Sequence, residues 1–215
     1  MPELIIERVV SFSINGEPQP PFLCTPEHLD ELALGHLLAQ GMAALEEVAS
    51  VRNDDAGVDI RLRPGASIRR ASILARLAAC VPGKPGFITP LADVRAMCER
   101  LLRDEAYFGA HRLMIACGGR EIFREDVGRH NAADKAIAFA ARSGWDFSRC
   151  ALGATGRISL EMLAKAAQMG IPVFFTRKYP SDISVQWAEK LGIALVARAH
   201  TGAPDVYGDR GRVIP

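Results

Sequence analysis

The sequence predicts a layered α/β fold in its C-terminal half, behind a smaller N-terminal part that is rich in β-strands. From residue 131 onward, short apolar strands alternate with amphipathic helices, and Gly144, Gly170 and Gly192 follow the helices. This alternation is typical of βαβ units, in which helices cover a sheet. Before residue 64, hydrophobic residues instead recur with a period of two on either side of turn residues, which indicates hairpins.

Residues 1–80 are expected to form the N-terminal β/α subdomain. Residues 4–14 and 18–24 flank Asn15-Gly16, the favoured pair for a tight hairpin turn. Thr25-Pro26 has the pattern of a helix start, with a cap followed by proline, and predicts a helix that ends near Gly41. A second predicted hairpin (45–53 and 57–63) and a second predicted helix (67–79) complete this part.

A Pro- and Gly-rich stretch at residues 81–89 is expected to be a mobile loop that joins the subdomain to an α/β domain of residues 90–215. Thr89-Pro90 predicts a helix that runs to about residue 104. The later elements are expected in the order strand pair 112–123, helix 131–143, strand 149–154, helix 158–169, strand 171–176, helix 181–191 and strand 193–199. The last dozen residues are Gly-rich and charged, which predicts a loop or tail.

Composition excludes several classes of protein. Lys and Arg total 26 against 25 Asp and Glu, so no global charge favours nucleic acid or a membrane surface. No apolar run approaches the roughly 20 residues that span a bilayer, and the N-terminus does not resemble a signal peptide, so a cytoplasmic location is expected. The five scattered cysteines form no C-x-x-C pair, and neither a disulfide framework nor a metal site is expected. Cys98, Cys117 and Cys150 are predicted to lie in the core.

The stretch from Phe123 to Ile137 concentrates polar side chains at a predicted strand-to-helix junction. Such a junction favours an anion, because the first N–H groups of a helix lack partners. Residues 155–159 form a second junction, and both are expected at one sheet edge, which predicts a phosphate or nucleotide site. The alternative is structural, with Asn131 capping its helix and Arg129 pairing with Glu125 or Asp126. The candidate binding residues in the two turns are Gly128, Arg129, His130, Asn131, Gly156, Arg157 and Ser159.

Three more side chains could complete this site. Asp126 could orient His130, the natural proton carrier, although a histidine beside a cap is more often structural. His111 has the same two interpretations. Lys135 could reach the cleft from its place one turn beyond Asn131, although a solvated lysine is the alternative.

Cys80 is the candidate for sulfur chemistry. It lies in a predicted loop after a helix with three arginines, and nearby cations lower the pKa of a thiol, which favours the reactive thiolate. The alternative is an inert surface cysteine.

At these residues the chain resembles the FdhD family, the formate dehydrogenase accessory sulfurtransferases. Residues 124–131 read R-E-D-V-G-R-H-N and are followed by Ala-x-Asp-Lys135, which resembles the family's hallmark. Gly156-Arg-Ile-Ser159 resembles its second motif, and residues 30–35, together with Gly41, resemble its N-terminal helix signature. The segments 170–173 and 191–195 follow in the expected order, so the resemblance covers nearly the whole chain.

The resemblance implies a cytidine-deaminase-like α/β domain. The deaminase zinc signature, H-x-E with P-C-x-x-C, is missing from this sequence, so the fold analogy does not imply deamination. The resemblance implies that Cys80 receives persulfide sulfur from a cysteine desulfurase. The acceptor would be the molybdenum of a bis-molybdopterin guanine dinucleotide cofactor (Mo-bisMGD) bound for formate dehydrogenase or a related molybdoenzyme. The cleft would hold the guanine nucleotide and phosphates, which GDP would mimic. The resemblance also implies a homodimer.

The chain departs from the family at several motifs. The family's loop reads C-G-x-C-G, whereas here Cys80 is followed by Val-Pro-Gly83. A single loop cysteine can carry a persulfide but cannot resolve it through an adjacent thiol. The T-G-G-x-H motif has become Tyr107-Phe-Gly-Ala-His111, the asparagine expected before Val-Tyr is Asp205, and the glycines before it are reduced to Gly202. A non-catalytic, cofactor-binding chaperone is therefore the alternative function, and an enzyme acting on a small nucleotide through His130 and Asp126 is a third.

Overall fold

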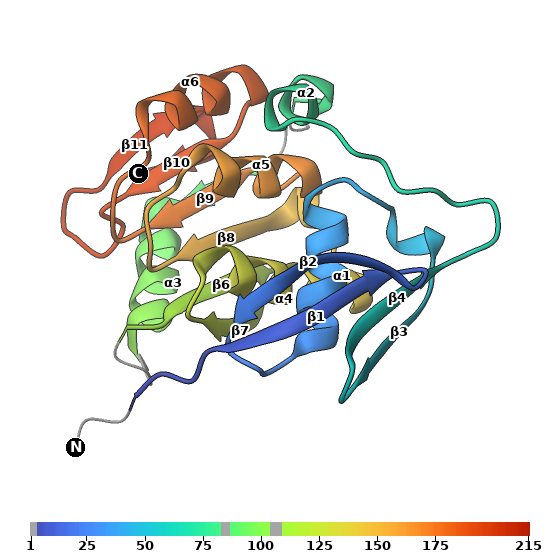
Figure 1. Cartoon of the computed structure of the whole chain (residues 1–215). Helices are drawn as coiled ribbons and strands as arrows, with labels where there is room; N and C mark the ends of the chain where they lie inside the picture. Colours follow the sequence, from blue (N-terminus) through green and yellow to red (C-terminus); the bar gives the residue numbers. More distant parts are fainter. Residues whose placement is uncertain (1–3, 83–86, 104–108) are drawn as a thin grey trace.

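The computed structural model describes residues 4–82, 87–103 and 109–215. These residues form six α-helices and three β-sheets (Figure 1). A four-stranded sheet lies in the N-terminal part, and a six-stranded sheet between helices forms the larger layer. The predicted layered α/β fold with a β-rich N-terminal part is confirmed.

The N-terminal sheet has the strand order β2-β1-β4-β3. Its strands are β1 (Arg8–Ile14), β2 (Glu17–Cys24), β3 (Val48–Asp54) and β4 (Gly57–Leu62). Both predicted hairpins are present, and the first turns at Asn15-Gly16 with the positive φ angles that this pair favours. Phe12, Ile14 and Ile60 bury one face of the sheet against helix α1 (Leu29–Ala39).

The predicted helix start at Thr25-Pro26 is wrong, because α1 begins four residues later, at Leu29. Thr25 makes tertiary contacts instead of capping a helix. Its hydroxyl accepts a hydrogen bond from the Val127 N–H (3.2 Å), and its carbonyl accepts one from the Lys135 Nζ (2.9 Å). These contacts hold the end of β2 against the larger domain.

Helix α2 (Ile73–Ala79) begins six residues later than predicted, with Ser72 as its cap. The preceding segment is held in a non-helical path by Arg69. The Arg69 N–H donates to the carbonyl of Met42 (2.9 Å), and its guanidinium pairs with Glu47. Of the predicted mobile loop at 81–89, residues 83–86 lie outside the described residues.

The larger sheet has the strand order β11-β10-β9-β8-β6-β7. Its strands are β6 (His111–Cys117), β7 (Arg120–Asp126), β8 (Cys150–Ala154), β9 (Val173–Thr176), β10 (Ala194–Ala197) and β11 (Asp205–Gly208). β8, β9 and β10 are parallel, whereas β6, β7 and β11 each run antiparallel to their neighbours. The helices that pack on this sheet are α3 (Leu91–Arg103), α4 (Arg129–Arg142), α5 (Leu160–Met169) and α6 (Asp182–Leu191). The hydrophobic clusters put α4, α5 and α6 on one face and α3 on the other.

The C-terminal segment forms strands, so the predicted loop or tail is wrong. β11 covers the edge of β10, and the Arg198 Nε donates to the Asp205 Oδ2 (2.8 Å) across the turn between them. β12 (Val213–Ile214) pairs with β5 (Thr89–Pro90), so Thr89 is a strand residue rather than a helix cap. Pairing with a neighbouring strand, rather than a local pattern, determines both outcomes. The helix predicted to follow Thr89-Pro90 was expected to end at about residue 104, which lies outside the described residues. Short 3₁₀ turns lie at Leu45–Glu47, Phe147–Arg149 and Arg210–Arg212.

Helix α1 belongs to both hydrophobic cores. Leu32 and Leu37 pack under the N-terminal sheet, whereas Leu34 packs in the core of the larger domain. The helix lies so close to α4 that a Cβ at Gly35 would lie 1.8 Å from the carbonyl oxygen of Asp134. Only glycine permits this approach.

Candidate functional site

The carboxyl ends of β8 and β9 form one wall of the candidate site. The turn after β8 is held by the strand beside it, because the Thr176 hydroxyl donates to the Gly156 carbonyl (2.6 Å) and the Arg177 Nε donates to the Thr155 carbonyl (3.2 Å). On the other side, the Thr155 N–H donates to the carbonyl of Arg112 in β6 (3.0 Å). The turn is therefore fixed from both neighbouring strands.

The two predicted turns meet at Gly156. A Cβ at this position would lie 3.2 Å from the His111 Nδ1 and 3.3 Å from the Arg129 Cδ. Its φ is not in the left-handed region, so close approach of neighbours, rather than backbone conformation, favours glycine here. The structure thus brings together the end of β8, the start of β6 and the start of α4, as the sequence predicted for the turns.

Two polar groups beside this junction lack hydrogen-bond partners among the described residues. They are the Nε of Arg129 and the hydroxyl of Ser159, and both atoms are buried. Ser159 occupies the N-cap position of α5, but its side chain makes no capping hydrogen bond. A buried polar group without a partner costs about 1–3 kcal/mol, so these two groups indicate a place where an external acceptor would be stabilised.

A fully buried ion pair between Asp126 and Lys135 lies beneath the start of α4, on its core side. The Lys135 Nζ donates to the Asp126 Oδ2 (2.7 Å), and neither side chain is exposed. The Asp126 carboxylate also accepts hydrogen bonds from the backbone N–H groups of Gly128 (2.8 Å) and Thr25 (3.2 Å). Asp126 and Lys135 therefore fix the turn at residues 126–128 from its buried side. The alternative of a solvated Lys135 is wrong.

Asn131 is not the cap of its helix, because Gly128 occupies the N-cap position. The Asn131 side-chain amide instead donates to the Asp126 Oδ1 (3.0 Å) and to the carbonyl of Leu23 (2.8 Å). The acids named as possible partners of Arg129 form ion pairs with other cations: Glu125 with Arg112 and Asp126 with Lys135. Sequence reasoning missed Thr25 and Leu23, which are more than 100 residues from their partners and carry no local signal.

His130 lies at the same helix start, but its carboxylate partner is Glu161 (Nε2 to Oε2, 3.4 Å). The prediction that Asp126 orients it is therefore wrong, because the Asp126 carboxylate is taken up by Lys135 and its other donors. Burial, followed by Lys165 and Arg129, lowers the pKa of His130 below its ordinary value. The lowered pKa favours the neutral imidazole of His130, and a bound anion would favour its protonation.

His111 is half-buried at the start of β6. Burial, followed by the positive charges of Arg129 and Arg177, lowers its pKa. Arg129 and Arg177 thus create a positive potential around His111, and this potential favours binding of an anion. Arg157, which directly follows Gly156, is exposed.

Cys80 lies elsewhere in the molecule, at the end of α2. It lines a cavity of about 540 Å³ together with Arg69, Arg76 and residues 167–170 at the end of α5. Ser159 lies at the other end of α5, a helix of 10 residues that spans about 15 Å. Cys80 is therefore near the amino ends of the parallel strands, whereas Gly156 is at their carboxyl ends.

The pKa of Cys80 is raised, because burial outweighs the lowering effect of Arg76. The prediction of a lowered pKa is therefore wrong. The arginines of this segment do not lower the pKa of Cys80 enough to offset burial, since the guanidinium of Arg69 is paired with Glu47. The predicted core positions of Cys98, Cys117 and Cys150 are confirmed, because all three are buried.

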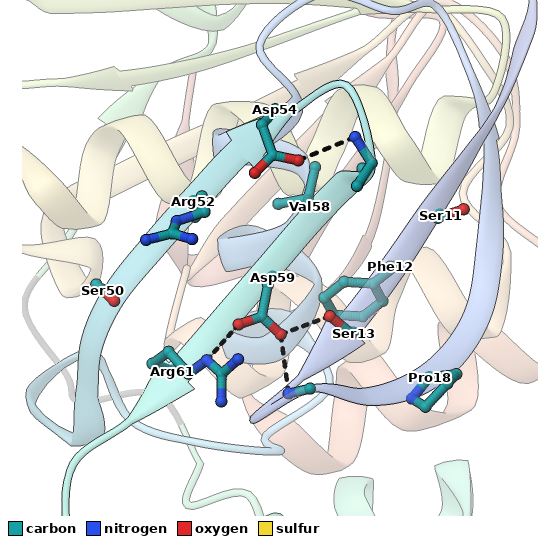
Figure 2. A pocket seen from close by; sticks show the side chains of 13 residues that line it. Ser11, Phe12, Ser13, Pro18, Ser50, Arg52, Asp54, Val58, Asp59 and Arg61 are labelled. Atoms are coloured by element: carbon teal, nitrogen blue, oxygen red, sulfur yellow. Dashed lines mark hydrogen bonds and ion pairs between the residues drawn. The ribbon is translucent and has the colours of Figure 1, made fainter.

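A hollow of about 670 Å³ lies on the outer face of the N-terminal sheet, away from the Gly156 junction (Figure 2). The carboxylate at its centre, that of Asp59, has partners within the hollow. Asp59 accepts hydrogen bonds from Ser13 and the Gly16 N–H, and it pairs with Arg61. This hollow therefore presents no unpaired buried polar group of the kind found at Arg129 and Ser159.

Within residues 4–82, 87–103 and 109–215, no group of three or more His, Cys, Asp or Glu side chains could hold a metal ion. No helix in the same residues is long and apolar enough to cross a membrane.

Known proteins resemble this chain along nearly its whole length. A protein of Geobacillus kaustophilus named sulfur carrier protein FdhD is 28% identical over 99% of this chain and 90% of its own. The protein of the same name from Shouchella clausii is 29% identical over 94% of this chain and 86% of its own. The crystal structure of a candidate formate dehydrogenase accessory protein from Desulfotalea psychrophila matches with a TM-score of 0.81 at 23% identity, over 97% of this chain and 89% of that one, which shows a shared fold. The model of the FdhD/NarQ family matches residues 5–87 and 91–214, and the chain belongs to this family.

Proposed function

We propose that this protein is a sulfur carrier in the maturation of formate dehydrogenase or a related molybdoenzyme. Cys80 takes sulfane sulfur from a cysteine desulfurase, and the Gly156 junction binds the Mo-bisMGD to which the sulfur is delivered. The observation that carries the proposal is the pair of buried, unpartnered polar groups on Arg129 and Ser159 beside Gly156. The names of the similar proteins support the sulfur-carrier part.

The residues at the junction fit the phosphates of a guanine nucleotide. Helices α4 and α5 both begin there, and helix N-termini stabilise anions. The Nε of Arg129 has no hydrogen-bond partner within the part of the chain that the structure describes, and the guanidinium of Arg157 is exposed. Gly156 lets the side chains of His111 and Arg129 lie against the turn, where any larger residue would contact His111.

Loading of Cys80 is a thiol exchange that needs no external oxidant. The Cys80 thiolate attacks the terminal sulfur of the donor's persulfide, one S–S bond forms as another breaks, and the donor cysteine leaves as a thiolate. Arg76 lines the same cavity as Cys80, and its buried Nε has no hydrogen-bond partner among the described residues. This Nε could therefore stabilise the charged sulfur. Because burial raises the pKa of Cys80, loading is expected to accelerate as pH rises.

The loading test is an incubation with a cysteine desulfurase and cysteine, followed by intact-mass measurement without reductant. Wild type is expected to gain one sulfur atom, and Cys80→Ser none. Cys98→Ala is the matched control, since it removes a buried cysteine and leaves Cys80 in place. An unmodified wild type would rule out sulfur transfer by this chain.

The binding test is calorimetry with GDP. Arg129→Ala removes a charge-assisted donor worth about 1.5–3 kcal/mol, so affinity is expected to fall about 10-fold to 100-fold. Arg52→Ala, on the exposed face of β3, is the control and should bind as wild type does. If wild type binds neither GDP nor Mo-bisMGD, the binding part of the proposal fails, whatever the outcome of loading.

A second candidate function is a cofactor-binding chaperone without sulfur transfer. The presence of Gly83 in place of a second loop cysteine and the raised pKa of Cys80 both favour it. This candidate predicts GDP binding by a wild type that gains no sulfur. The homodimer is a separate proposal, tested by light scattering against the 23.3 kDa mass of one chain.

A further inference from the structure

Cys117 and Cys150 face each other across the antiparallel strands β6 and β8. Cys117 is the last residue of β6, Cys150 is the first of β8, and the two are direct partners in the strand register. Both are free thiols on the side of the sheet that packs against α4. Neither residue contributes to the Gly156 junction or lines the Cys80 cavity described above.

The type of strand pair brings these two cysteines close together. Partners in an antiparallel ladder alternate between hydrogen-bonded and non-hydrogen-bonded pairs. Thr155 and Arg112 occupy a hydrogen-bonded position, since the Thr155 N–H donates to the Arg112 carbonyl, while the Arg112 N–H donates to the Thr155 hydroxyl. Five positions further along the register, Cys117 and Cys150 form a non-hydrogen-bonded pair, with a Cα separation of about 4.5 Å. Disulfides form across Cα separations of roughly 4.4–6.8 Å.

The side chains point toward the same place. Both sulfur atoms lie within reach of the carbonyl oxygen of Asp146, at 3.6 Å for Cys117 and 3.2 Å for Cys150. Burial, followed by the neighbouring Cys117 thiol, raises the pKa of Cys150 and favours its neutral thiol form.

We propose that Cys117 and Cys150 form a redox-active thiol pair that closes reversibly to an intramolecular disulfide. The inference stands on the strand register and on the shared Asp146 acceptor, and it does not rest on the sulfur-carrier function of Cys80. The oxidant is a small disulfide such as glutathione disulfide.

The reaction proceeds by two exchanges. The Cys117 thiolate attacks one sulfur of glutathione disulfide and releases one glutathione thiolate, leaving a mixed disulfide. The Cys150 thiolate then attacks the Cys117 sulfur and releases the second glutathione. Two cysteine thiols are oxidised to one disulfide, one glutathione disulfide is reduced to two glutathiones, and the protons pass to solvent. Cys117 reacts first, because it is 7% exposed beside the Gly118-Gly119 turn, whereas Cys150 is fully buried.

The disulfide would close a loop that contains β7 and α4. This loop carries Asp126, Arg129 and Lys135, the residues that build one side of the Gly156 junction. Because a crosslink restricts the unfolded chain, oxidation is expected to shift the urea midpoint of unfolding upward. Oxidation is thus expected to favour the folded form of the segment that carries these candidate binding residues.

The test is a titration of the whole protein through glutathione buffers of rising disulfide content. Thiols are then blocked with iodoacetamide in urea, and the protein is digested with trypsin under non-reducing conditions. Cleavage after arginine places Cys117 in the peptide 113–120 and Cys150 in the peptide 150–157. The expected product is these two peptides joined, and dithiothreitol should separate them.

Matched variants locate the bond. Cys117→Ala and Cys150→Ala should each abolish the joined peptides, whereas Cys80→Ser and Cys98→Ala should retain them. Retention in Cys80→Ser separates this pair from the sulfur-carrier proposal. Wild-type protein that stays folded in fully oxidising glutathione, yet yields both peptides only with blocked thiols or single glutathione adducts, would overturn the proposal.

Discussion

Replacing Lys135 by methionine removes one member of a fully buried ion pair and changes the side-chain volume little. The Lys135 Nζ lies 2.7 Å from the Asp126 Oδ2 and 2.9 Å from the Thr25 carbonyl, and no part of either charged side chain reaches solvent. In Lys135→Met the Asp126 carboxylate keeps its N–H donors but loses its counter-charge.

The expected cost follows from this geometry. Breaking a buried pair by removing one partner destabilises a protein by about 3–5 kcal/mol. At roughly 2–4 °C per kcal/mol for a chain of this length, the Tm should fall by about 6–20 °C. Because Thr25 loses a contact in the same variant, the link between β2 and α4 should loosen as well.

The assay is urea unfolding at pH 7, followed by circular dichroism, for four proteins. They are wild type, Lys135→Met, Asp126→Asn with Lys135→Met, and Lys178→Met as the exposed control. The double variant holds no buried charge at this pair, so it should lose less stability than Lys135→Met alone. A loss below about 1 kcal/mol in Lys135→Met, as expected for an exposed pair, would refute the reasoning, and so would a double variant less stable than the single one.

Three further outcomes are expected. Gly156→Ala should weaken GDP binding about 10-fold, at about 1.4 kcal/mol, in calorimetry with the Tm nearly unchanged, because the new Cβ crowds His111 and Arg129; unchanged affinity would contradict this site. Burial and Arg129 lower the pKa of His111, and a bound anion raises it, so GDP affinity should increase as pH falls from 8 to about 6, with a flatter profile in His111→Gln. Burial opposes ionisation of Asp134, but Lys165 outweighs it and the pKa of Asp134 is lowered. The Asp134 carboxylate therefore stabilises the fold above the unfolded pKa near 3.9, and this stabilisation is lost as pH falls through the folded pKa. The difference in urea stability between wild type and Asp134→Asn should accordingly close in acid.

The site could be predicted from sequence where a local pattern carries it. Strands followed by polar turns and helix starts predicted that residues 128–131 and 155–159 share a sheet edge, and the contacts around Gly156 agree. The partners of Asp126 could not be predicted in this way. Thr25 lies about 100 residues away, and its Thr-Pro pattern predicted a helix cap, because cap statistics do not include a tertiary contact.

The environment of Cys80 was equally hidden. The sequence places three arginines in the preceding segment, which predicts a lowered pKa, but the balance is decided by burial against α5. The C-terminal strands were missed for a related reason. Residues 205–208 are strand-forming only because the edge of β10 is available to them, and no period-two pattern marks this segment.

The shared position of α1 suggests how the molecule would behave if its backbone were interrupted. Residues 63–72 are largely exposed and contain no helix or strand, so a nick in this connector would cut no regular element. The N-terminal piece would still hold α1 against α4 through the glycine contact at residue 35, and Thr25 would still receive Lys135. Two co-expressed polypeptides divided within residues 63–72 should therefore reassemble by fragment complementation, with α1 forming the interface between them.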